Sequence, residues 1–405
     1  MELEFHDSQV AQSDRTVMLK DFDASVWGTD AREAWKALRA NGPLIEPREG
    51  LLVAASTTAV EQILRQPNLF SSNPEAAYFG SDTGAIPLQI DPPEHVSYRK
   101  ILDPLFSPKR MAQREAEVAE LVNELIDGFV GKGSCDFIAD FAVPFPSAMF
   151  LRLMGLPYED LSTFLWAKDG MIRPDGDDEE TRKANMEKTS SWIFAYFAKA
   201  LEQKTSEPAD DILSYFVELE GEGRLTRDET LNICLLLIAA GLDTVTDTLG
   251  CSFSFLAQHP EYQRQLADDP SIVAAAVEEL MRFETPVPIV NRIAMEDTEL
   301  DGCPVKAKQR MRVMLSIPNH DPEIYGNPDT VDFARPVNRH IAFGGGVHRC
   351  LGSHLARLEL RVATREWHRR IPSYSLPEGF ELRYKPALRE IISLPLSFTP
   401  GPKEG

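Results

Sequence analysis

One short stretch, FGGGVHRCLG at residues 343–352, determines how the rest of this chain is interpreted. Its consecutive glycines, Gly344 to Gly346, allow a tight backbone turn and a close approach to a flat ligand. A helical pattern begins directly after Cys350. The thiol is therefore expected at a helix N-terminus, where free N–H groups and the helix dipole favour a thiolate. A thiolate beside glycines suits a haem iron, which takes it as an electron-donating axial ligand.

Other readings of this loop remain open on the residues alone. A glycine-rich loop before a helix can hold a phosphate, but neither the Lys-Ser/Thr of a P-loop nor Rossmann spacing is present. His348, Cys350 and His354 could bind zinc, although one cysteine with scattered histidines gives no closed set of four ligands. Cys350 could also act as a catalytic nucleophile.

Composition limits the class of protein. The chain has 405 residues with a net charge of −21, so nucleic acid is not an expected partner. The polar, acidic start does not resemble a signal peptide, and the longest apolar run, 233–242, is about half the roughly 20 residues needed to cross a bilayer. Five cysteines without paired spacing indicate a reducing compartment. We therefore expect a cytoplasmic protein that is not bound to a membrane.

Positive charge is concentrated late in this acidic chain. Residues 335–370 hold eight arginines against Glu359 and Glu366, a local charge of +6. Four of these arginines recur every four residues on one expected helix face: Arg357, Arg361, Arg365 and Arg369. This stripe is either a solvated helix face or a docking surface for an acidic protein.

Helical patterns predominate along the chain. They are expected over 31–40, 58–66, 108–130, 181–205, 227–258, 271–283 and 352–370, with a capping box at Thr226 and Glu229. Short strands are expected at 44–47, 51–54, 290–294, 312–315 and 391–398. The pattern predicts one mainly α domain over 1–405, whose β-rich part lies mainly at 40–60, 290–316 and 375–400.

The loop at 343–352 resembles the haem-binding signature of the cytochrome P450 superfamily, F-G-G-G-x-H-x-C-x-G, at every fixed position, and Leu355, Ala356, Arg357 and Glu359 match its continuation. The resemblance implies haem b as cofactor, with Cys350 as axial ligand to the iron. It also implies that His348 hydrogen-bonds a propionate and that Phe343 and Gly344 belong to the cofactor loop, with Phe343 packed beside the haem.

Two further motifs match the family in the same order. Glu279 and Arg282 resemble its E-x-x-R pair, which joins a later arginine, here Arg335, in a buried structural network. In isolation such a pair is most often an exposed helix salt bridge. The segment Ala240-Gly241-Leu242-Asp243-Thr244 resembles the oxygen-activation motif of the long central helix. The resemblance implies that Thr244 hydrogen-bonds the bound oxygen and that Asp243 helps to deliver protons.

Three cationic side chains match the family's remaining propionate contacts. His95 and Arg99 lie four apart in a helix that follows Asp91-Pro92-Pro93, and Arg292 lies ten residues beyond Arg282. Taken alone, His95 and Arg99 would most often be a surface pair. Val245 and the segment Pro318-Asn319-His320-Asp321 depart from the usual family pattern, and Val245 affects only the detail of the proton relay.

The resemblance implies a triangular helical prism, with the haem between the central helix and the helix after Cys350. The implied reaction is monooxygenation by O2, with electrons passing from NAD(P)H through a reductase and a small acidic ferredoxin. We expect the ferredoxin to dock near Arg99, Arg357 and Arg361 on a monomer. A ligand-sensing haem protein or a peroxide-using enzyme is less favoured, because neither requires the Asp243–Thr244 pair.

The substrate is expected to be a small or medium hydrophobic molecule, with a terpenoid or aromatic compound favoured and a fatty or aromatic acid second. By family position the pocket draws on apolar residues: Ile86, Leu88, Leu237, Ala240, Val287, Pro288, Ile289, Ala387 and Leu388.

Overall fold

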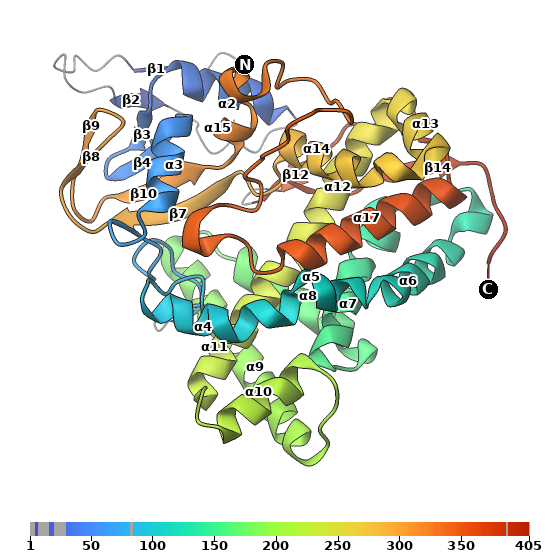
Figure 1. Cartoon of the computed structure of the whole chain (residues 1–405), viewed down its shortest axis with the longest axis horizontal. Helices are drawn as coiled ribbons and strands as arrows, with labels where there is room; N and C mark the ends of the chain where they lie inside the picture. The colour runs from blue at the N-terminus through green and yellow to red at the C-terminus, as the bar shows by residue number, and fades with distance from the viewer. Residues whose placement is uncertain (1–4, 7–15, 20–29, 82–83, 386–387, 405) are drawn as a thin grey trace.

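Helices occupy most of the chain, and a sheet of seven strands lies to one side of them (Figure 1). The computed structural model describes residues 5–6, 16–19, 30–81, 84–385 and 388–404. The predicted class, mainly α with small sheets, is confirmed by this arrangement.

The helices follow the apolar periodicity of the sequence. In chain order they are α2 (Ala31–Ala40), α3 (Thr57–Arg65), α4 (Glu94–Leu102), α5 (Pro108–Ala112), α6 (Glu115–Asp127), α7 (Pro144–Met154), α8 (Leu161–Ile172), α9 (Glu179–Ser206), α10 (Ile212–Gly221), α11 (Arg227–Gly241), α12 (Asp243–Gln258), α13 (Pro260–Asp268), α14 (Val273–Glu284), α15 (Ser316–Asn319), α16 (Pro322–Tyr325) and α17 (Ser353–Arg370). The helix expected over 108–130 is interrupted between α5 and α6, and nothing in the local sequence marks that interruption.

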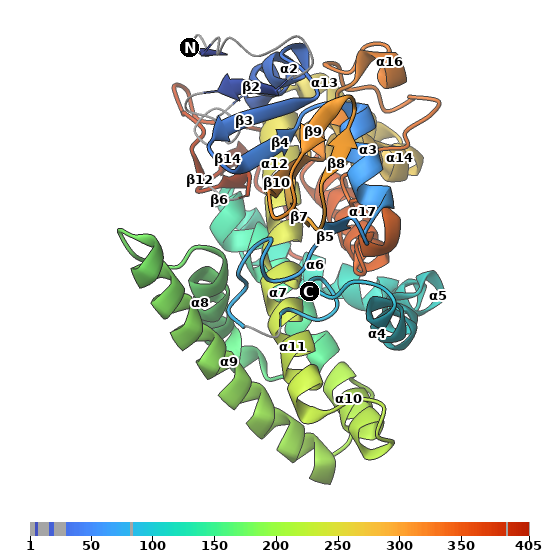
Figure 2. The same ribbon diagram turned by 90° about the vertical axis from the view of Figure 1, so that its left-hand side faces the viewer.

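Helices α11 and α12 run end to end through the middle of the molecule, with α8 and α9 along one side (Figure 2). The predicted capping box begins α11: the Thr226 hydroxyl accepts from the Glu229 N–H, and Glu229 accepts from the Thr226 N–H at 2.7 Å. The single helix expected over 227–258 is broken at Leu242. Around the break the Thr244 hydroxyl donates to the Ala240 carbonyl at 2.9 Å, and such side-chain donors compete with regular helical bonding.

The stretch from Arg227 to Gln258 is apolar and long enough to cross a membrane, but 78% of its most apolar window is buried inside the protein. This degree of burial is typical of a core helix. Helix α17 packs against α12, α14 and α6.

The large sheet joins strands from both ends of the chain. Its order is β1 (Phe5–His6), β2 (Thr16–Leu19), β3 (Leu44–Arg48), β4 (Leu51–Ala54), β10 (Arg310–Met314), β7 (Ile289–Ala294) and β5 (Phe70–Ser71). Strand β10 pairs with β4 in parallel and with β7 antiparallel, so Val313 lies between Ala54 and Val290. This pairing holds Arg292 of β7 opposite Met311, directly after the segment 287–289.

Three smaller sheets complete the β structure. They are β11 (Tyr374–Ser375) with β14 (Pro395–Phe398) and β6 (Ser134–Asp136), β12 (Tyr384–Lys385) with β13 (Glu390–Ile391), and β8 (Thr298–Leu300) with β9 (Cys303–Val305). Strands β1, β2, β5 and β6 lie outside the segments expected to be β-rich. These strands are short, and long-range pairing of this kind leaves little periodicity in the sequence.

Candidate active site

The loop before α17 folds back on itself through backbone hydrogen bonds. The Cys350 N–H donates to the Phe343 carbonyl at 2.9 Å. Gly344 and Gly346 have φ angles of 68° and 64°, which only glycine adopts at little cost. A Cβ atom on Gly346 would also collide with the Leu64 carbonyl oxygen of α3. The glycines therefore determine the loop conformation that presents Cys350.

The Cys350 side chain is accessible to solvent, whereas Cys135, Cys234, Cys251 and Cys303 are buried. The protein nevertheless surrounds Cys350 closely, and this burial raises the pKa of its thiol. A hydrogen bond from the backbone of Gly352, and the charges of Arg99 and Arg357, act in the opposite direction on that pKa. The helix N-terminus thus favours the thiolate as expected, but burial outweighs it.

Nitrogen-bearing side chains from helix α4, strand β7 and the Cys350 loop lie close together. The rings of His95 in α4 and His348 lie 4.5 Å apart between centroids. Burial, followed by the positive charges of Arg292, His95 and Arg99, lowers the pKa of His348 to about 3. The sequence-predicted propionate contacts are therefore close together in space, although they are distant in sequence.

Several of these groups lack an acidic partner. Both ring nitrogens of His95 are buried without a hydrogen bond within the described chain. Arg292 is 5% exposed, donates to the Asn291 carbonyl at 2.6 Å, and forms no ion pair with a described acid. Arg99, by contrast, pairs with Asp103 and donates to the Arg349 carbonyl at 2.8 Å. Buried donors of this kind require an anionic or accepting ligand, and the two propionates of a haem fit that requirement.

On the central helix, Asp243 begins α12 and is 1% exposed. Its carboxylate pairs with Lys168 at 2.6 Å and with Arg173 at 2.9 Å. These two cations of the α8 region were missed from the sequence. The signal that was available is a lysine and an arginine in a segment that is otherwise largely apolar, 161–173.

Ala240 and Gly241 are exposed and Thr244 is half-buried, although most of the residues around them in α11 and α12 are buried. The exposed part of this helix pair therefore coincides with the predicted oxygen-activation motif.

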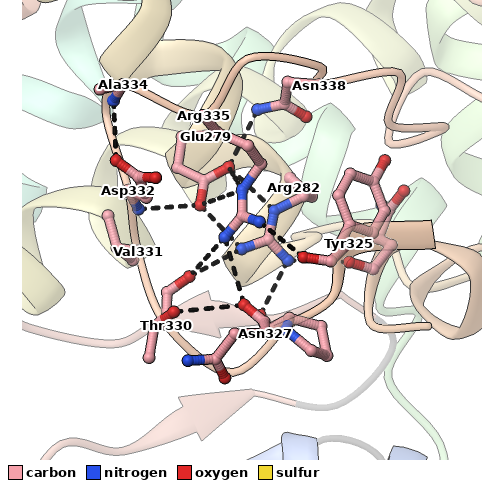
Figure 3. A network of polar contacts seen from close by, with 12 residues as sticks. Glu279, Arg282, Tyr325, Asn327, Thr330, Val331, Asp332, Ala334, Arg335 and Asn338 are labelled. Atoms are coloured by element: carbon pink, nitrogen blue, oxygen red, sulfur yellow. Dashed lines mark hydrogen bonds and ion pairs between the residues drawn. The ribbon is translucent and has the colours of Figure 1, made fainter. Parts of the chain in front are cut away.

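Glu279 is the centre of a buried network (Figure 3). Its carboxylate accepts two hydrogen bonds from Arg282, at 2.8 and 2.9 Å, and two from Arg335, both at 3.0 Å. Asn338 donates to the same carboxylate at 3.0 Å, and the Asp332 N–H does so at 3.0 Å. Glu279 and Arg282 are almost fully buried, so this pair is not an exposed helix salt bridge. The network joins α14 to the segment that leads to the Cys350 loop.

The sequence-predicted pocket residues fall in different surroundings. Leu88 is 36% exposed and Ala240 is exposed, whereas Leu237, Val287 and Leu388 are partly buried. Pro288 is buried, and Ile86 belongs to the core between the helices. Ile289 is partly buried and packs against the core around Trp35 and Ile317. Ala387 lies outside the described residues.

The arginine stripe on α17 divides into paired and unpaired members. Arg357 binds Glu278 through two hydrogen bonds, at 2.7 and 2.8 Å, and covers the Phe343 ring. Arg365 and Arg369 pair with Glu115, Glu366 and Glu404. Arg361 is exposed, and its guanidinium donates to the backbone carbonyl of Arg357 at 3.2 Å. Only part of the stripe is therefore available to another molecule.

Comparison with known proteins gives a consistent result. The family model described as Cytochrome P450 matches residues 179–366. A steroid C26-monooxygenase of Mycobacterium tuberculosis (strain ATCC 25618 / H37Rv) is 34% identical over 385 residues, 93% of this chain and 96% of that protein. A biotin biosynthesis cytochrome P450 of Bacillus subtilis (strain 168) is 33% identical over 310 residues, 76% of this chain and 78% of that protein. The solved structure of myxobacterial cytochrome P450 CYP267B1 with myristic acid has a TM-score of 0.86 at 30% identity, over 93% of this chain and 98% of that chain.

Proposed function

Because this chain belongs to the cytochrome P450 family and is a haem-thiolate monooxygenase, we propose that Cys350 is its iron ligand and that its substrate is a small or medium hydrophobic molecule. The observation that carries the assignment is the accessible Cys350 thiol in the same loop as half-buried His348, whose ring lies against that of buried His95, with buried Arg292 close by. Haem b, when bound there, would supply the redox chemistry that splits O2, since a thiolate ligand favours O–O cleavage.

The propionates of the haem would be held by His95, His348, Arg99 and Arg292. His95 and Arg292 are the strongest candidates, because each is buried with no acidic partner in ion-pair contact among the described residues. Charge-assisted hydrogen bonds to a carboxylate would compensate for the desolvation of these donors. Phe343 and Gly344 would complete the cofactor loop.

On the central helix, we assign Asp243 and Thr244 to proton delivery. Thr244 is half-buried, and its hydroxyl donates a hydrogen bond to the carbonyl of Ala240, which is an exposed residue. Asp243 is adjacent in sequence and is anchored by Lys168 and Arg173. An acid next to an alcohol is a sensible arrangement for passing protons, and it favours O2-driven over peroxide-driven chemistry.

Two substrate classes are supported by different observations. The apolar candidates Leu88, Leu237 and Val287 favour a terpenoid or an aromatic compound. A fatty or aromatic acid is second, because structures similar to this chain hold myristic acid or a hexadecenoyl chain on a carrier protein. A screen for substrate-induced shifts of the haem absorption spectrum across both classes would decide between them.

Electrons are assigned to a small acidic ferredoxin, reduced in turn from NAD(P)H. The support is the positive charge around Cys350 in a chain whose net charge is −21. Arg361 is exposed on α17, and Arg349, adjacent to Cys350, is also exposed. We also propose that the protein is cytoplasmic and monomeric.

The iron ligand is tested by Cys350→His. The reduced, carbon-monoxide-bound protein should show the absorption band typical of thiolate ligation, and the variant should lose that band. Replacement of a buried cysteine, Cys303→Ala in β9, is the control and should keep it. Survival of the band in Cys350→His would show that the assigned ligand is wrong.

A further inference from the structure

A second acid lies one helical turn beyond Asp243 on α12. Asp247 is 1% exposed, as Asp243 is, and residues four apart lie on the same face of a helix. The two carboxyl groups differ in their contacts. Each oxygen of Asp243 meets a cation, whereas both oxygens of Asp247 are buried without a hydrogen-bond partner. Within the described part of the chain, no other carboxyl group has both oxygens in that condition.

The charges around these acids already balance without Asp247. Three cations face this region: Lys168 and Arg173 from α8 and its C-cap, and Lys385 from β12. Three other acids pair with them. Asp243 contacts Lys168 and Arg173, Glu390 of β13 contacts Arg173 and Lys385, and the exposed Asp169 contacts Lys168 and Arg173. A fourth negative charge, on Asp247, would be buried with no cation of the described residues in contact.

A carboxyl group in that position is neutral, because burial of an unpaired charge is costly. Burial raises the pKa of Asp247 well above its ordinary value, and the charge of Asp243 raises it further against the opposing effects of Arg173, Lys168 and Lys385. Towards its C-terminal side on the same helix, Asp247 is followed by Cys251, whose thiol donates to the Arg389 carbonyl, while Arg389 itself pairs with Glu284. None of these groups supplies a cation to Asp247.

Asp243, in contrast to Asp247, lies in contact with cations. Each oxygen of its carboxylate contacts a cation, an arrangement that favours the carboxylate without a bound proton. A proton must reach Asp243 before each delivery, and the neighbouring buried group that holds one is Asp247.

We propose that Asp247 is a neutral carboxylic acid that supplies protons to Asp243 during oxygen activation. In this step the O–H bond of Asp247 breaks and a new O–H bond forms on the carboxylate of Asp243, through an intervening water because the two carboxyl groups are not hydrogen-bonded to each other, and Asp247 is left as the anion. Asp247 then regains a proton from water at the side of the cluster where Lys385 is 37% exposed. This inference rests on the proton-delivery role assigned to Asp243 in the proposed function.

The protonation state is measured first, on the holoenzyme. Infrared spectra of protein with carbon-13 in its aspartate carboxyl groups separate aspartate bands from those of glutamate, including buried Glu359. We expect a C=O band of a protonated aspartate at neutral pH that is lost in Asp247→Asn. Asp169→Asn, which changes the same cluster at an exposed position, should retain the band. Absence of the band in the wild type overturns the proposal whether or not the variant folds.

The proton transfer is measured second. Asp247→Asn keeps the size of the side chain but holds no transferable proton, so turnover should fall about tenfold or more, with a larger solvent isotope effect. The substrate-induced spectral shift should stay as in the wild type. Wild-type turnover and isotope effect in Asp247→Asn, alongside slow turnover in Asp243→Asn, would overturn this inference alone. Wild-type turnover in Asp243→Asn would instead refute the role assigned to Asp243.

Discussion

At the scale of single residues, the site depends on partners that lie far apart in sequence. Arg173 meets Asp243 across 70 residues, and Arg99 reaches the backbone of Arg349 across 250. The residues with fixed spacing, such as Cys350 with its glycines and Glu279 with Arg282, could be predicted from sequence. Lys168 and Arg173 stand out in an otherwise largely apolar segment, but their pairing with Asp243 could not be predicted, because it arises only when α8 packs beside the central helix.

The first prediction concerns Asp243. Asp243→Asn removes the acid–base group and leaves Lys168 and Arg173 facing a neutral amide. Turnover should fall by about 10²–10⁴, the usual contribution of general acid–base catalysis. Haem content and the substrate-induced spectral shift should remain close to those of the wild type. Steady-state turnover with a saturating electron supply measures the effect, and an unchanged rate would exclude Asp243 from proton delivery.

The second prediction concerns Thr244. Thr244→Ala removes the hydroxyl that donates to the Ala240 carbonyl at 2.9 Å. Substrate binding should persist, but a larger share of the electrons consumed should end as hydrogen peroxide instead of product. Thr244→Ser is the matched control, because serine keeps the hydroxyl group and should largely preserve coupling. Equal peroxide yields in the wild type and Thr244→Ala would remove the residue from oxygen activation.

At the scale of elements, most helices could be predicted from periodicity, and the start of α11 from its capping box. The breaks at Leu242 and at Gln113–Arg114 could not, because they depend on how the pieces pack. The same limit applies to the arginine stripe on α17. Helical spacing places its members on one face, but it does not show that Arg357 bridges to α14 through Glu278.

The third prediction concerns this bridge between α14 and α17. Burial alone would raise the pKa of Glu278, but hydrogen bonds from His340 and Arg357 outweigh it and lower the pKa from 4.5 to about 2. A depressed pKa stabilises the folded state above the unfolded value, and this stabilisation is lost as pH falls from about 4.5 towards 2. Glu278→Gln should therefore cost about 1–3 kcal/mol at neutral pH, after allowance for partial exposure.

The measurement is chemical unfolding of wild type and Glu278→Gln at a series of pH values from neutral downward. The difference in free energy of unfolding should shrink as the pH falls below about 4.5. Glu61→Gln is the control, because the Glu61–Arg65 pair on α3 is exposed and should contribute little. A difference that stays constant with pH would show that Glu278 acts through packing and not through its charge.

At the scale of the whole molecule, positive charge is concentrated in one region although the net charge is strongly negative. The chain carries −21, yet the helix after Cys350 and the loop before it are rich in arginine. Helices α4 and α17 lie on the same side of the molecule (Figure 1). Four cations on this side are exposed: Lys100 at the end of α4, Lys109 in α5, Arg349 beside Cys350 and Arg361 in α17. An acidic electron carrier would approach Cys350 most readily here.

The last prediction tests this docking face. Arg361 is the cleanest site, because it is exposed and forms no ion pair with an acid in the described part of the chain, whereas Arg357 is bound to Glu278. Rim charges mainly accelerate encounter, and the Debye length falls from about 30 Å at 0.01 M salt to about 10 Å at 0.1 M. Electron transfer from an acidic ferredoxin to the wild type should therefore slow as salt is added. Electron transfer to Arg361→Glu should be slower at low salt and less sensitive to added salt, with the substrate-induced spectral shift of the variant unchanged.

The control is Arg224→Glu, an equal change of charge in the segment that follows α10, which lies away from α17 (Figure 1); this variant should behave as the wild type. Identical salt curves for wild type and Arg361→Glu would mean that this side of α17 is only a solvated helix face.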